Sequence, residues 1–328
     1  MKIFISRNLP EDSLKGFDNA GHEVIVSEFD RPLKEEELVE KVKGVDALLS
    51  LLNDRIDGDL LDAAGPQLKI VSNYAVGFDN IDVKAATDRG VVITNTPCDE
   101  VNEAVAELTW AIVLSLSRRI VEADESVRRG AYKGWEPSIF LGSQVRGKTL
   151  GIVGMGSIGS MVARKAKGFD MQVLYTKRSP DPELEKELGV KFSDLDNLLA
   201  TSDFVSLHVP LTDQTRHMIN HDTINKMKRG AYLVNTARGP VVREQALVDA
   251  LRDGHLGGAG LDVFDNEPNV NPELINMENV ILTPHIASAT HESRAKMGEL
   301  AVQAVLKTLS GEMPPNIVNK EVWPARRR

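Results

Sequence analysis

Residues 149–168 read TLGIVGMGSIGSMVARKAKG and give the strongest indication of the fold. A short apolar run leads into three glycines spaced G-x-G-x-x-G, and a helical pattern follows directly. In that setting Gly154 permits a tight turn, Gly156 leaves room for phosphates beside the backbone, and Gly159 lets helix and strand pack closely. Phosphates bind to the free N–H groups at the start of such a helix. The pattern therefore predicts a dinucleotide-binding turn, the alternative being a glycine-rich turn without a ligand.

Apolar runs of strand length alternate with helical patterns on both sides of this turn. Such alternation is typical of a parallel sheet covered by helices. The runs fall into two series, which predicts an α/β protein with two parallel-sheet domains of Rossmann-like or flavodoxin-like class. The expected strands are residues 2–6, 22–27, 47–52, 68–72 and 90–95, then a run from 149, 171–176, 204–209, 231–236, 259–264 and 280–285; residues 34–42 and 81–88 are expected helices.

A long helix is predicted between the two series, with Asn102 as its N-cap and Gly130 as its stop. Its middle, residues 108–117, is apolar on nearly every side, which leaves a core helix and a subunit interface as open alternatives. A last helix, from about residue 291 to residue 310, is expected to return the chain to the first domain. The Arg326–Arg328 run that follows is expected to be a solvated tail.

Composition narrows the class of protein. The chain has 328 residues, is 42% hydrophobic and 27% charged, and carries a formal net charge of −9, so nucleic acid and anionic membranes are poor partners. Cys98 is its one cysteine, which excludes a disulfide framework and a cysteine-based metal cluster. We see no apolar core of a signal peptide and no uncharged apolar stretch of the roughly 18 residues that a membrane helix needs. We therefore expect a soluble cytoplasmic protein that holds no metal.

The strand after the glycine turn indicates which dinucleotide binds. A site specific for NAD usually has an acidic residue about 20 residues after the motif, where it accepts a hydrogen bond from the ribose. Here the strand ends in Lys177, Arg178 and Ser179, Asp170 lies at its other end, and Asp181 lies beyond a proline. The two cations attract a 2′-phosphate, so the sequence favours NADP(H), with NAD(H) and a merely solvated basic turn as alternatives.

Further positions at strand ends are assigned to the cofactor. His208 ends one strand and is expected near the cofactor without doing chemistry. The complete set of expected cofactor-binding residues is Gly154, Met155, Gly156, Ser157, Ile158, Gly159, Lys177, Arg178, Ser179, His208, Val209, Pro210, Thr236, Ala237, Arg238 and Asp262.

Three side chains that follow strands are candidates for catalysis. His285 is placed to exchange a proton near neutral pH, and Arg238 to clamp a carboxylate and polarise a neighbouring carbonyl. Glu267 is placed to stabilise the protonated imidazole of His285. In parallel sheets ligands gather at the carboxyl ends of strands, where all three residues fall. The alternatives are a structural ion pair for Arg238 with Glu267 and a capping role for His285.

Several motifs together resemble the D-isomer-specific 2-hydroxyacid dehydrogenases, over essentially the whole chain. They are NYAVGFDNID (73–82), GMGSIG (154–159), VNTARGPVV (234–242), GAGLDVFDNEP (258–268) and NVILTPHIASAT (279–290), in the order of the family. Within that family the chain looks most like the glyoxylate/hydroxypyruvate reductases, some of which use NADP.

The resemblance implies roles for individual residues. It makes Arg238 and Glu267 members of an active-site trio in which His285 donates the proton. It also implies that the backbone N–H groups of residues 76 and 77 hold the substrate carboxylate. The residues that it adds to the site are Val76 and Gly77, Arg294, which helps to bind hydroxypyruvate in some members, and Trp135, which reaches the active site of the neighbouring subunit.

The resemblance also implies an organisation and an activity. A discontinuous substrate domain, residues 1–101 plus 285–328, and a dinucleotide domain, residues 102–284, are expected to border an active-site cleft. A homodimer is expected, with the helix near residues 102–130 at its interface. The implied activity is reduction of glyoxylate or hydroxypyruvate by NADPH to the D-2-hydroxy acid. The alternatives are another D-2-hydroxyacid dehydrogenase, of D-glycerate, 2-ketogluconate or D-lactate type, and a dinucleotide-sensing protein like the corepressors of this fold.

Overall fold

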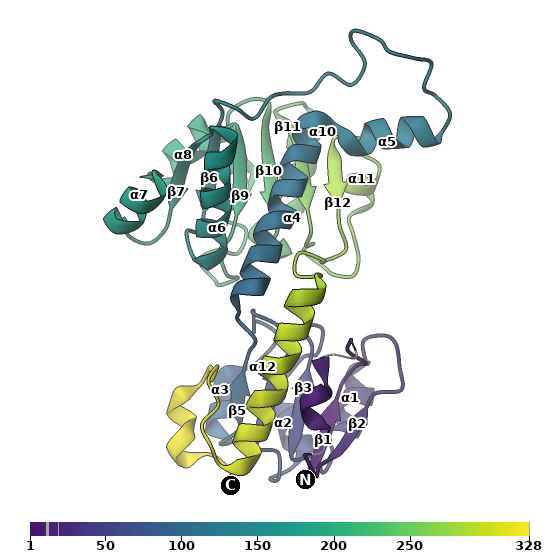
Figure 1. Cartoon of the computed structure of the whole chain (residues 1–328), viewed down its shortest axis with the longest axis vertical. Coiled ribbons are helices and arrows are strands. Elements are labelled where there is room, and N and C mark those ends of the chain that lie inside the picture. Colours follow the sequence, from purple (N-terminus) through teal and green to yellow (C-terminus); the bar gives the residue numbers. More distant parts are fainter. Residues whose placement is uncertain (11–12, 19, 328) are drawn as a thin grey trace. The chain divides into compact units, whose positions relative to one another are not determined.

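The computed structural model describes residues 1–10, 13–18 and 20–327. The chain forms two compact units, each with its own sheet (Figure 1). Unit 1 comprises Met1–Val101 with Ala289–Arg328, and unit 2 comprises Asn102–Ser288. The sequence-based division resumed the first domain at residue 285, whereas the structure resumes unit 1 four residues later. His285 therefore belongs to unit 2, together with the strand that precedes it.

Unit 1 is built on five parallel strands in the order β2-β1-β3-β4-β5. Each apolar run of the first series forms one of these strands, as predicted. Four of the strands are almost entirely buried because helices cover both faces of the sheet, which is why they have no polar alternation. The strands are β1 Lys2–Ile5, β2 Glu23–Val26, β3 Ala47–Ser50, β4 Ile70–Asn73 and β5 Val92–Thr94.

The helices of unit 1 lie on the two faces of this sheet. On β4, Val71 packs into an apolar cluster with side chains of the first three helices, whereas the Ser72 hydroxyl donates to the Ala301 carbonyl of the last helix at 3.2 Å. The last helix thus returns to unit 1, as predicted, and covers the second face (Figure 1). The helices are α1 Glu35–Lys41, α2 Gly58–Ala64, α3 Val83–Asp88 and α12 His291–Ser310, with 3-10 helices at Lys15–Phe17 and Lys320–Ala325.

Unit 2 is built on seven parallel strands in the order β12-β11-β10-β9-β6-β7-β8. From the central β6 the chain runs to β7 on one side and later to β9 on the other, and ligands bind at such a reversal of strand order. The glycine turn follows β6 and so lies at this point. The strands are β6 Thr149–Val153, β7 Gln172–Thr176, β8 Lys191–Phe192, β9 Phe204–Leu207, β10 Ala231–Asn235, β11 Leu256–Leu261 and β12 Val280–Leu282.

The predicted long helix is two helices. The N-cap prediction at Asn102 is wrong, because the first helix already begins at Asp99. The helical path breaks at Arg119, which has left-handed backbone angles (φ 52°, ψ 41°). The helices around the second sheet are α4 Asp99–Arg118, α5 Ile120–Arg128, α6 Ser157–Ala166, α7 Pro182–Leu188, α8 Leu195–Thr201, α9 His221–Lys226, α10 Glu244–Arg252 and α11 Pro272–Ile275, with 3-10 helices at Lys167–Phe169 and Gly239–Val241.

The apolar middle of α4 is explained by burial within unit 2. Trp110 and Ile112 belong to the buried cluster between α4, α6 and the sheet, and the indole N–H of Trp110 donates to the Val162 carbonyl at 3.0 Å. On β11 a Cβ at Gly260 would lie 2.1 Å from a methyl carbon of Ile112, so glycine is needed for this close packing. These contacts favour the core-helix interpretation. None of the helices in the described ranges is long and apolar enough to cross a membrane.

The prediction of a solvated tail is wrong for Arg326 and Arg327, while Arg328 lies outside the described residues. The guanidinium of Arg327 donates to the carbonyls of Arg89 (2.7 Å), Gly65 (2.6 Å) and Leu68 (3.1 Å). Arg326 stacks on Trp323, with its guanidinium carbon 3.6 Å from the ring centroid. The tail is therefore attached to unit 1 by side chains whose polarity alone suggested solvent.

Arg327→Ala is expected to lower the free energy of unfolding by about 1–3 kcal/mol, because it removes the donors to three part-buried carbonyls. Urea-induced unfolding measures the change. The control is Arg55→Ala, since Arg55 forms ion pairs with Glu35 and Asp57 at the surface. Exposed pairs of this kind contribute about 0–1 kcal/mol. Equal losses in the two variants would contradict the attachment of the tail through Arg327.

Candidate active site

The three catalytic candidates follow three neighbouring strands of unit 2. Arg238 comes shortly after β10, Glu267 after β11, and His285 after β12, and these strands lie side by side and parallel. Their carboxyl ends therefore share one edge of the sheet. There the Nδ1 atom of His285 and the Oε2 atom of Glu267 are 2.8 Å apart, and both side chains are about two-thirds buried, with 30% and 28% of their surface exposed.

Glu267 is held in its charged form. Burial alone would raise the pKa of this carboxyl group, but the hydrogen bond from His285, the backbone N–H of Phe264 at 3.0 Å and the positive charge of Arg238 outweigh it and lower the pKa below the ordinary 4.5. A carboxylate only accepts hydrogen bonds, so Nδ1 of the imidazole carries a hydrogen toward it. The Nε2 atom of His285 is the remaining ring nitrogen and is the one that can exchange a proton with a ligand.

The loop that carries His285 is folded around Asp262. This carboxylate is fully buried and accepts hydrogen bonds from the Thr283 hydroxyl (2.6 Å) and the backbone N–H groups of Ile286 and Ala287 (2.8 Å each). The Asp262 carbonyl accepts from the His285 N–H at 2.9 Å, and His285 has φ 55°. Asp262 was predicted to bind the cofactor. That role stays a prediction. The Asp262 side chain is hydrogen-bonded to the loop that carries His285, so it helps to position His285.

A buried asparagine shapes the turn that carries Arg238. The Asn235 side chain donates from Nδ2 to the Arg238 carbonyl at 2.9 Å and accepts from the Ala237 N–H at 3.0 Å. The next residue, Thr236, forms a hydroxyl–hydroxyl hydrogen bond with Thr109 at 3.0 Å. Sequence reasoning missed Asn235. The signal that could have identified it is its place in the sequence, as an amide side chain between a buried apolar strand and the candidate arginine.

The glycine turn after β6 has room for a ligand on one side only. A Cβ at Gly154 would lie 2.5 Å from the His208 carbonyl oxygen, and one at Gly159 would lie 2.3 Å from the Gly154 carbonyl oxygen. A Cβ at Gly156 would meet nothing within 4 Å. Gly156 also precedes α6 without any side-chain cap, which leaves the first N–H groups of the helix open. These features fit the pyrophosphate of a dinucleotide.

The other predicted cofactor residues around this turn differ in what they offer. Met155 is buried in the apolar cluster of unit 2, so its backbone rather than its side chain is available. His208 shares a 2.8 Å hydrogen bond with Ser206, and burial lowers the pKa of this imidazole to about 4. It is neutral at physiological pH, in line with the expectation that it does no proton chemistry. The remaining residues lie in the first turn of α6 or directly after β9: Ser157, Ile158, Val209 and Pro210.

Positively and negatively charged side chains lie together at the end of β7. Arg178 and Ser179 are exposed, as a 2′-phosphate site requires. In the sequence Asp181 lies beyond the strand end and a proline, but the chain turns back after Pro180, and the Asp181 carboxylate lies 2.7 Å from the Lys177 ammonium. A carboxylate is therefore present beside the predicted phosphate site.

In unit 1 the loop after β4 presents two free N–H groups. The carbonyl of Val76 accepts from the Asn95 side chain at 2.7 Å, and that of Gly77 accepts from the Asn73 side chain at 2.9 Å. The N–H groups of Val76 and Gly77 donate to no other residue in the described ranges. Two adjacent N–H groups of this kind suit a carboxylate.

Arg294 lies close to the same loop of unit 1. The hydroxyl of Tyr74 donates to its carbonyl at 2.6 Å, and its guanidinium carbon lies 6.0 Å from the centroid of the Tyr74 ring. The structure thus brings the predicted substrate residues of unit 1 to one strand end. The roles of Val76, Gly77 and Arg294 in substrate binding stay predictions.

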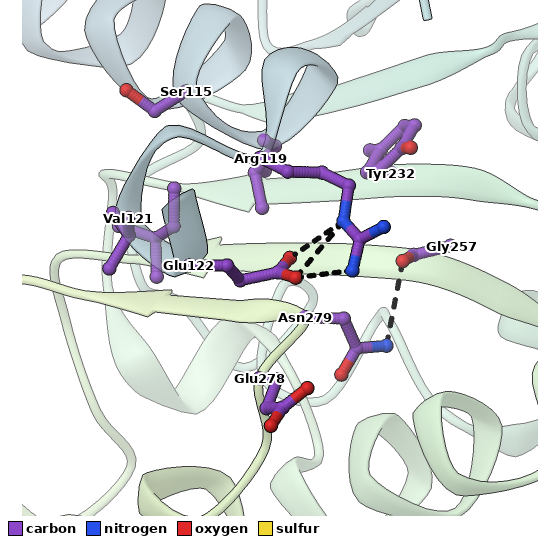
Figure 2. A pocket seen from close by; sticks show the side chains of 10 residues that line it. Ser115, Arg119, Val121, Glu122, Tyr232, Gly257, Glu278 and Asn279 are labelled. Atoms are coloured by element: carbon purple, nitrogen blue, oxygen red, sulfur yellow. Dashed lines mark hydrogen bonds and ion pairs between the residues drawn. The ribbon is translucent and has the colours of Figure 1, made fainter. Parts of the chain in front are cut away.

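A separate cavity of about 450 Å³ lies near the amino ends of the strands in unit 2. Figure 2 shows the ion pair of Arg119 with Glu122 at its centre and the hydrogen bond of Asn279 to the Gly257 carbonyl beside it. No predicted catalytic or cofactor residue lines it; the lining residues are Ser115, Leu116, Arg119, Val121, Glu122, Tyr232, Gly257, Glu278, Asn279 and Ile281. This cavity is therefore distinct from the edge that carries the trio.

The chain is similar in sequence to proteins of a known family. A family model described as "D-isomer specific 2-hydroxyacid dehydrogenase, NAD binding domain" matches residues 110–287. The chain is 50% identical over 330 residues to a protein named glyoxylate reductase from Thermococcus onnurineus, and the match covers 99% of this chain and 98% of the relative.

The chain is also similar to solved structures. The TT0316 protein from Thermus thermophilus is 43% identical, with a TM-score of 0.91 over 97% of this chain and 100% of its own. A glyoxylate reductase from Paecilomyes thermophila is 32% identical, with a TM-score of 0.85 over 98% of this chain and 99% of its own. The chain thus belongs to the D-isomer specific 2-hydroxyacid dehydrogenase family and is an NAD(P)-dependent oxidoreductase.

Proposed function

We propose that this enzyme reduces glyoxylate and hydroxypyruvate to the D-2-hydroxy acids with NADPH as the preferred cofactor. The observation that carries the proposal is the pair of His285 and Glu267 at 2.8 Å, on the strand edge where Arg238 also emerges. A proton donor, a carboxylate that stabilises it and a carboxylate-binding cation are the groups that reduction of a 2-oxo acid requires. The glyoxylate reductase relatives support the choice of substrate.

Each member of the trio has a distinct role in this proposal. The nicotinamide, when bound, supplies the hydride to the carbonyl carbon. Arg238 binds the substrate carboxylate and polarises the carbonyl, since its planar guanidinium pairs with a carboxylate through two hydrogen bonds. His285 donates the proton from Nε2 to the carbonyl oxygen. Glu267 orients the imidazole through Nδ1 and stabilises its protonated form.

The substrate assignments of unit 1 follow the free donors described above. The N–H groups of Val76 and Gly77 bind the substrate carboxylate, and Arg294 contributes to binding of the hydroxyl group of hydroxypyruvate. The preference for NADPH rests on Lys177, Arg178 and Ser179 at the end of β7, where two cations attract a 2′-phosphate.

We also propose that the enzyme is a homodimer. Most of its exposed large apolar side chains lie between residues 120 and 141, on α5 and the segment that follows it. An exposed apolar patch of this kind typically marks a protein–protein contact. The residues are Ile120, Val121, Val127, Tyr132, Trp135 (84% exposed), Ile139 and Leu141. Trp135 is proposed to reach the active site of the second copy. Sedimentation equilibrium of the Trp135→Ala and Val127→Glu variants tests whether this apolar patch holds the dimer together.

The function is tested by following NADPH and NADH oxidation with a panel of 2-oxo acids. Glyoxylate and hydroxypyruvate are expected to give the highest kcat/KM, and NADPH a higher kcat/KM than NADH. Higher values with pyruvate or 2-ketogluconate would assign the enzyme to another branch of the family. Absence of turnover with every acid would favour a dinucleotide-sensing role instead.

Glu267→Gln is expected to lower kcat for glyoxylate at neutral pH by about 10- to 100-fold, because it replaces a charge-assisted hydrogen bond to His285 of about 1.5–3 kcal/mol. Because the pKa of Glu267 is lowered, the wild type keeps this charge at neutral pH and loses it only in acid, below the ordinary range of a glutamate side chain. Glu244→Gln, which also alters a carboxylate that accepts a backbone N–H, is the control. Equal losses of kcat in both variants would contradict the role of Glu267.

A further inference from the structure

The segment between β7 and α7 is held in one conformation by a buried tyrosine. Tyr175 on β7 is fully buried, and its hydroxyl oxygen accepts from the backbone N–H of Asp181 at 2.8 Å. The same hydroxyl donates to the Glu185 carboxylate at 3.0 Å, one turn into α7. The chain therefore returns to the end of β7 at Asp181, which has a defined position beside the strand.

The two carboxylate oxygens of Asp181 have different partners. Oδ1 accepts from the Leu184 N–H at 3.2 Å and caps α7, while Oδ2 lies 2.7 Å from Nζ of Lys177. The hydrogen bond with Lys177 lowers the pKa of Asp181, so the carboxylate is charged at neutral pH. Both side chains are partly exposed, 27% of Lys177 and 36% of Asp181. The charge of Lys177 is thus already compensated within the protein.

Arg178 differs from Lys177 in this respect. It is exposed and forms no hydrogen bond or ion pair with the residues in the described ranges. A phosphate at this strand end meets one uncompensated cation, Arg178, and one cation that must exchange its partner, Lys177. The same phosphate also meets the negative charge of Asp181.

We propose that Asp181 is a selectivity residue for the cofactor, which competes with the adenosine 2′-phosphate for Lys177 and so limits the preference for NADPH. This inference rests on the proposed binding of NADP(H) at the end of β7. A cofactor without a 2′-phosphate has no group that needs the Lys177 charge, so its binding does not depend on the exchange.

The Asp181→Asn variant removes the negative charge of residue 181 without removing the N-cap of α7. Asparagine caps a helix about as well as aspartate, so α7 keeps its N-cap while the ion pair with Lys177 is lost. The probes are 2′,5′-ADP and 5′-AMP, which differ only in the 2′-phosphate, and calorimetry on the full chain measures their binding. We expect Asp181→Asn to bind 2′,5′-ADP about three- to tenfold more tightly, less so at high salt, and 5′-AMP as the wild type does.

Two further variants make the test specific. Asp57→Asn is the matched control, because Asp57 caps α2 and pairs with Arg55 at 3.1 Å in unit 1. It is expected to leave both affinities unchanged. In a Lys177→Met background, Asp181→Asn is expected to raise the affinity for 2′,5′-ADP less than it does in the wild type, because there is no cation to be released and only the repulsion between Asp181 and the phosphate is removed. A full gain in that background would overturn competition for Lys177.

The outcomes distinguish this inference from the proposed function. If the wild type binds 2′,5′-ADP more tightly than 5′-AMP and Asp181→Asn gives no gain, the inference is wrong and the NADP(H) proposal stands. If the wild type does not discriminate but Asp181→Asn does, Asp181 is the selectivity residue and the NADPH preference of the wild type is wrong. If neither the wild type nor Asp181→Asn binds 2′,5′-ADP more tightly than 5′-AMP, both the Asp181 inference and the NADPH preference are wrong. The ratio of kcat/KM for NADPH and NADH should follow the binding result.

Discussion

His285→Gln is expected to lower kcat for glyoxylate reduction by about 10²- to 10⁴-fold, the usual contribution of a positioned general acid. Glutamine can still donate a hydrogen bond but cannot deliver a proton from Nε2. The affinity for NADPH is expected to stay within a factor of about two, since His285 is assigned to the substrate rather than to the dinucleotide. Steady-state kinetics and direct titration of NADPH measure the two quantities separately.

The matched control is His221→Gln. His221 also pairs with a carboxylate, Asp249 at 3.1 Å, but on the exposed face of α9 and α10. Its replacement is expected to leave kcat unchanged. Wild-type turnover of the His285→Gln variant would rule out His285 as the proton donor.

Arg238→Met is expected to lower kcat/KM for glyoxylate by about 10³-fold, because it removes two charge-assisted hydrogen bonds of about 1.5–3 kcal/mol each. Arg238→Lys keeps the charge but not the planar fork, so a smaller loss of about 10- to 100-fold is expected. Most of the Arg238→Met loss should fall on KM if the residue mainly binds the carboxylate, and on kcat if it mainly polarises the carbonyl.

Arg243→Met is the control for this series, because Arg243 lies five positions further along the chain and is exposed. It is expected to change kcat/KM by less than a factor of two. Weaker binding of NADPH with unchanged KM for glyoxylate in Arg238→Met would assign Arg238 to the cofactor alone.

Local patterns were sufficient for most of the sheet. Both series of apolar runs form strands, because a strand buried on both faces must be continuously apolar over four or five residues. The edge strand β8, Lys191–Phe192, was missed, since two residues carry no periodicity. The break between α4 and α5 was missed as well, because Arg119 has no local preference for the left-handed conformation that it adopts.

In the candidate site, too, some residues could be predicted from the sequence and others could not. The glycine turn could be predicted because it depends on contacts between residues close in the chain, such as Gly159 against the Gly154 carbonyl. The spacing of its glycines can therefore be recognised in the sequence. The trio could be located because parallel strands bring their carboxyl ends to one edge whatever their order. Asn235 and Asp262 were not recognised as positioning residues, because their partners are loop N–H groups and carbonyls that sequence does not identify.

Residue types and their spacing were thus enough to determine the two parallel sheets, the dinucleotide turn and the strand ends that carry Arg238, Glu267 and His285. The tertiary structure decided the partners of charged side chains: Lys177 pairs with Asp181 rather than with solvent, and Arg327 binds the carbonyls of unit 1. The physical reason is that propensity and periodicity act over a few neighbouring residues. The energy of a charge depends instead on every group within a few ångströms of it, and the folded path of the chain decides which groups those are, whether four positions away, as Asp181 is from Lys177, or 262, as Gly65 is from Arg327.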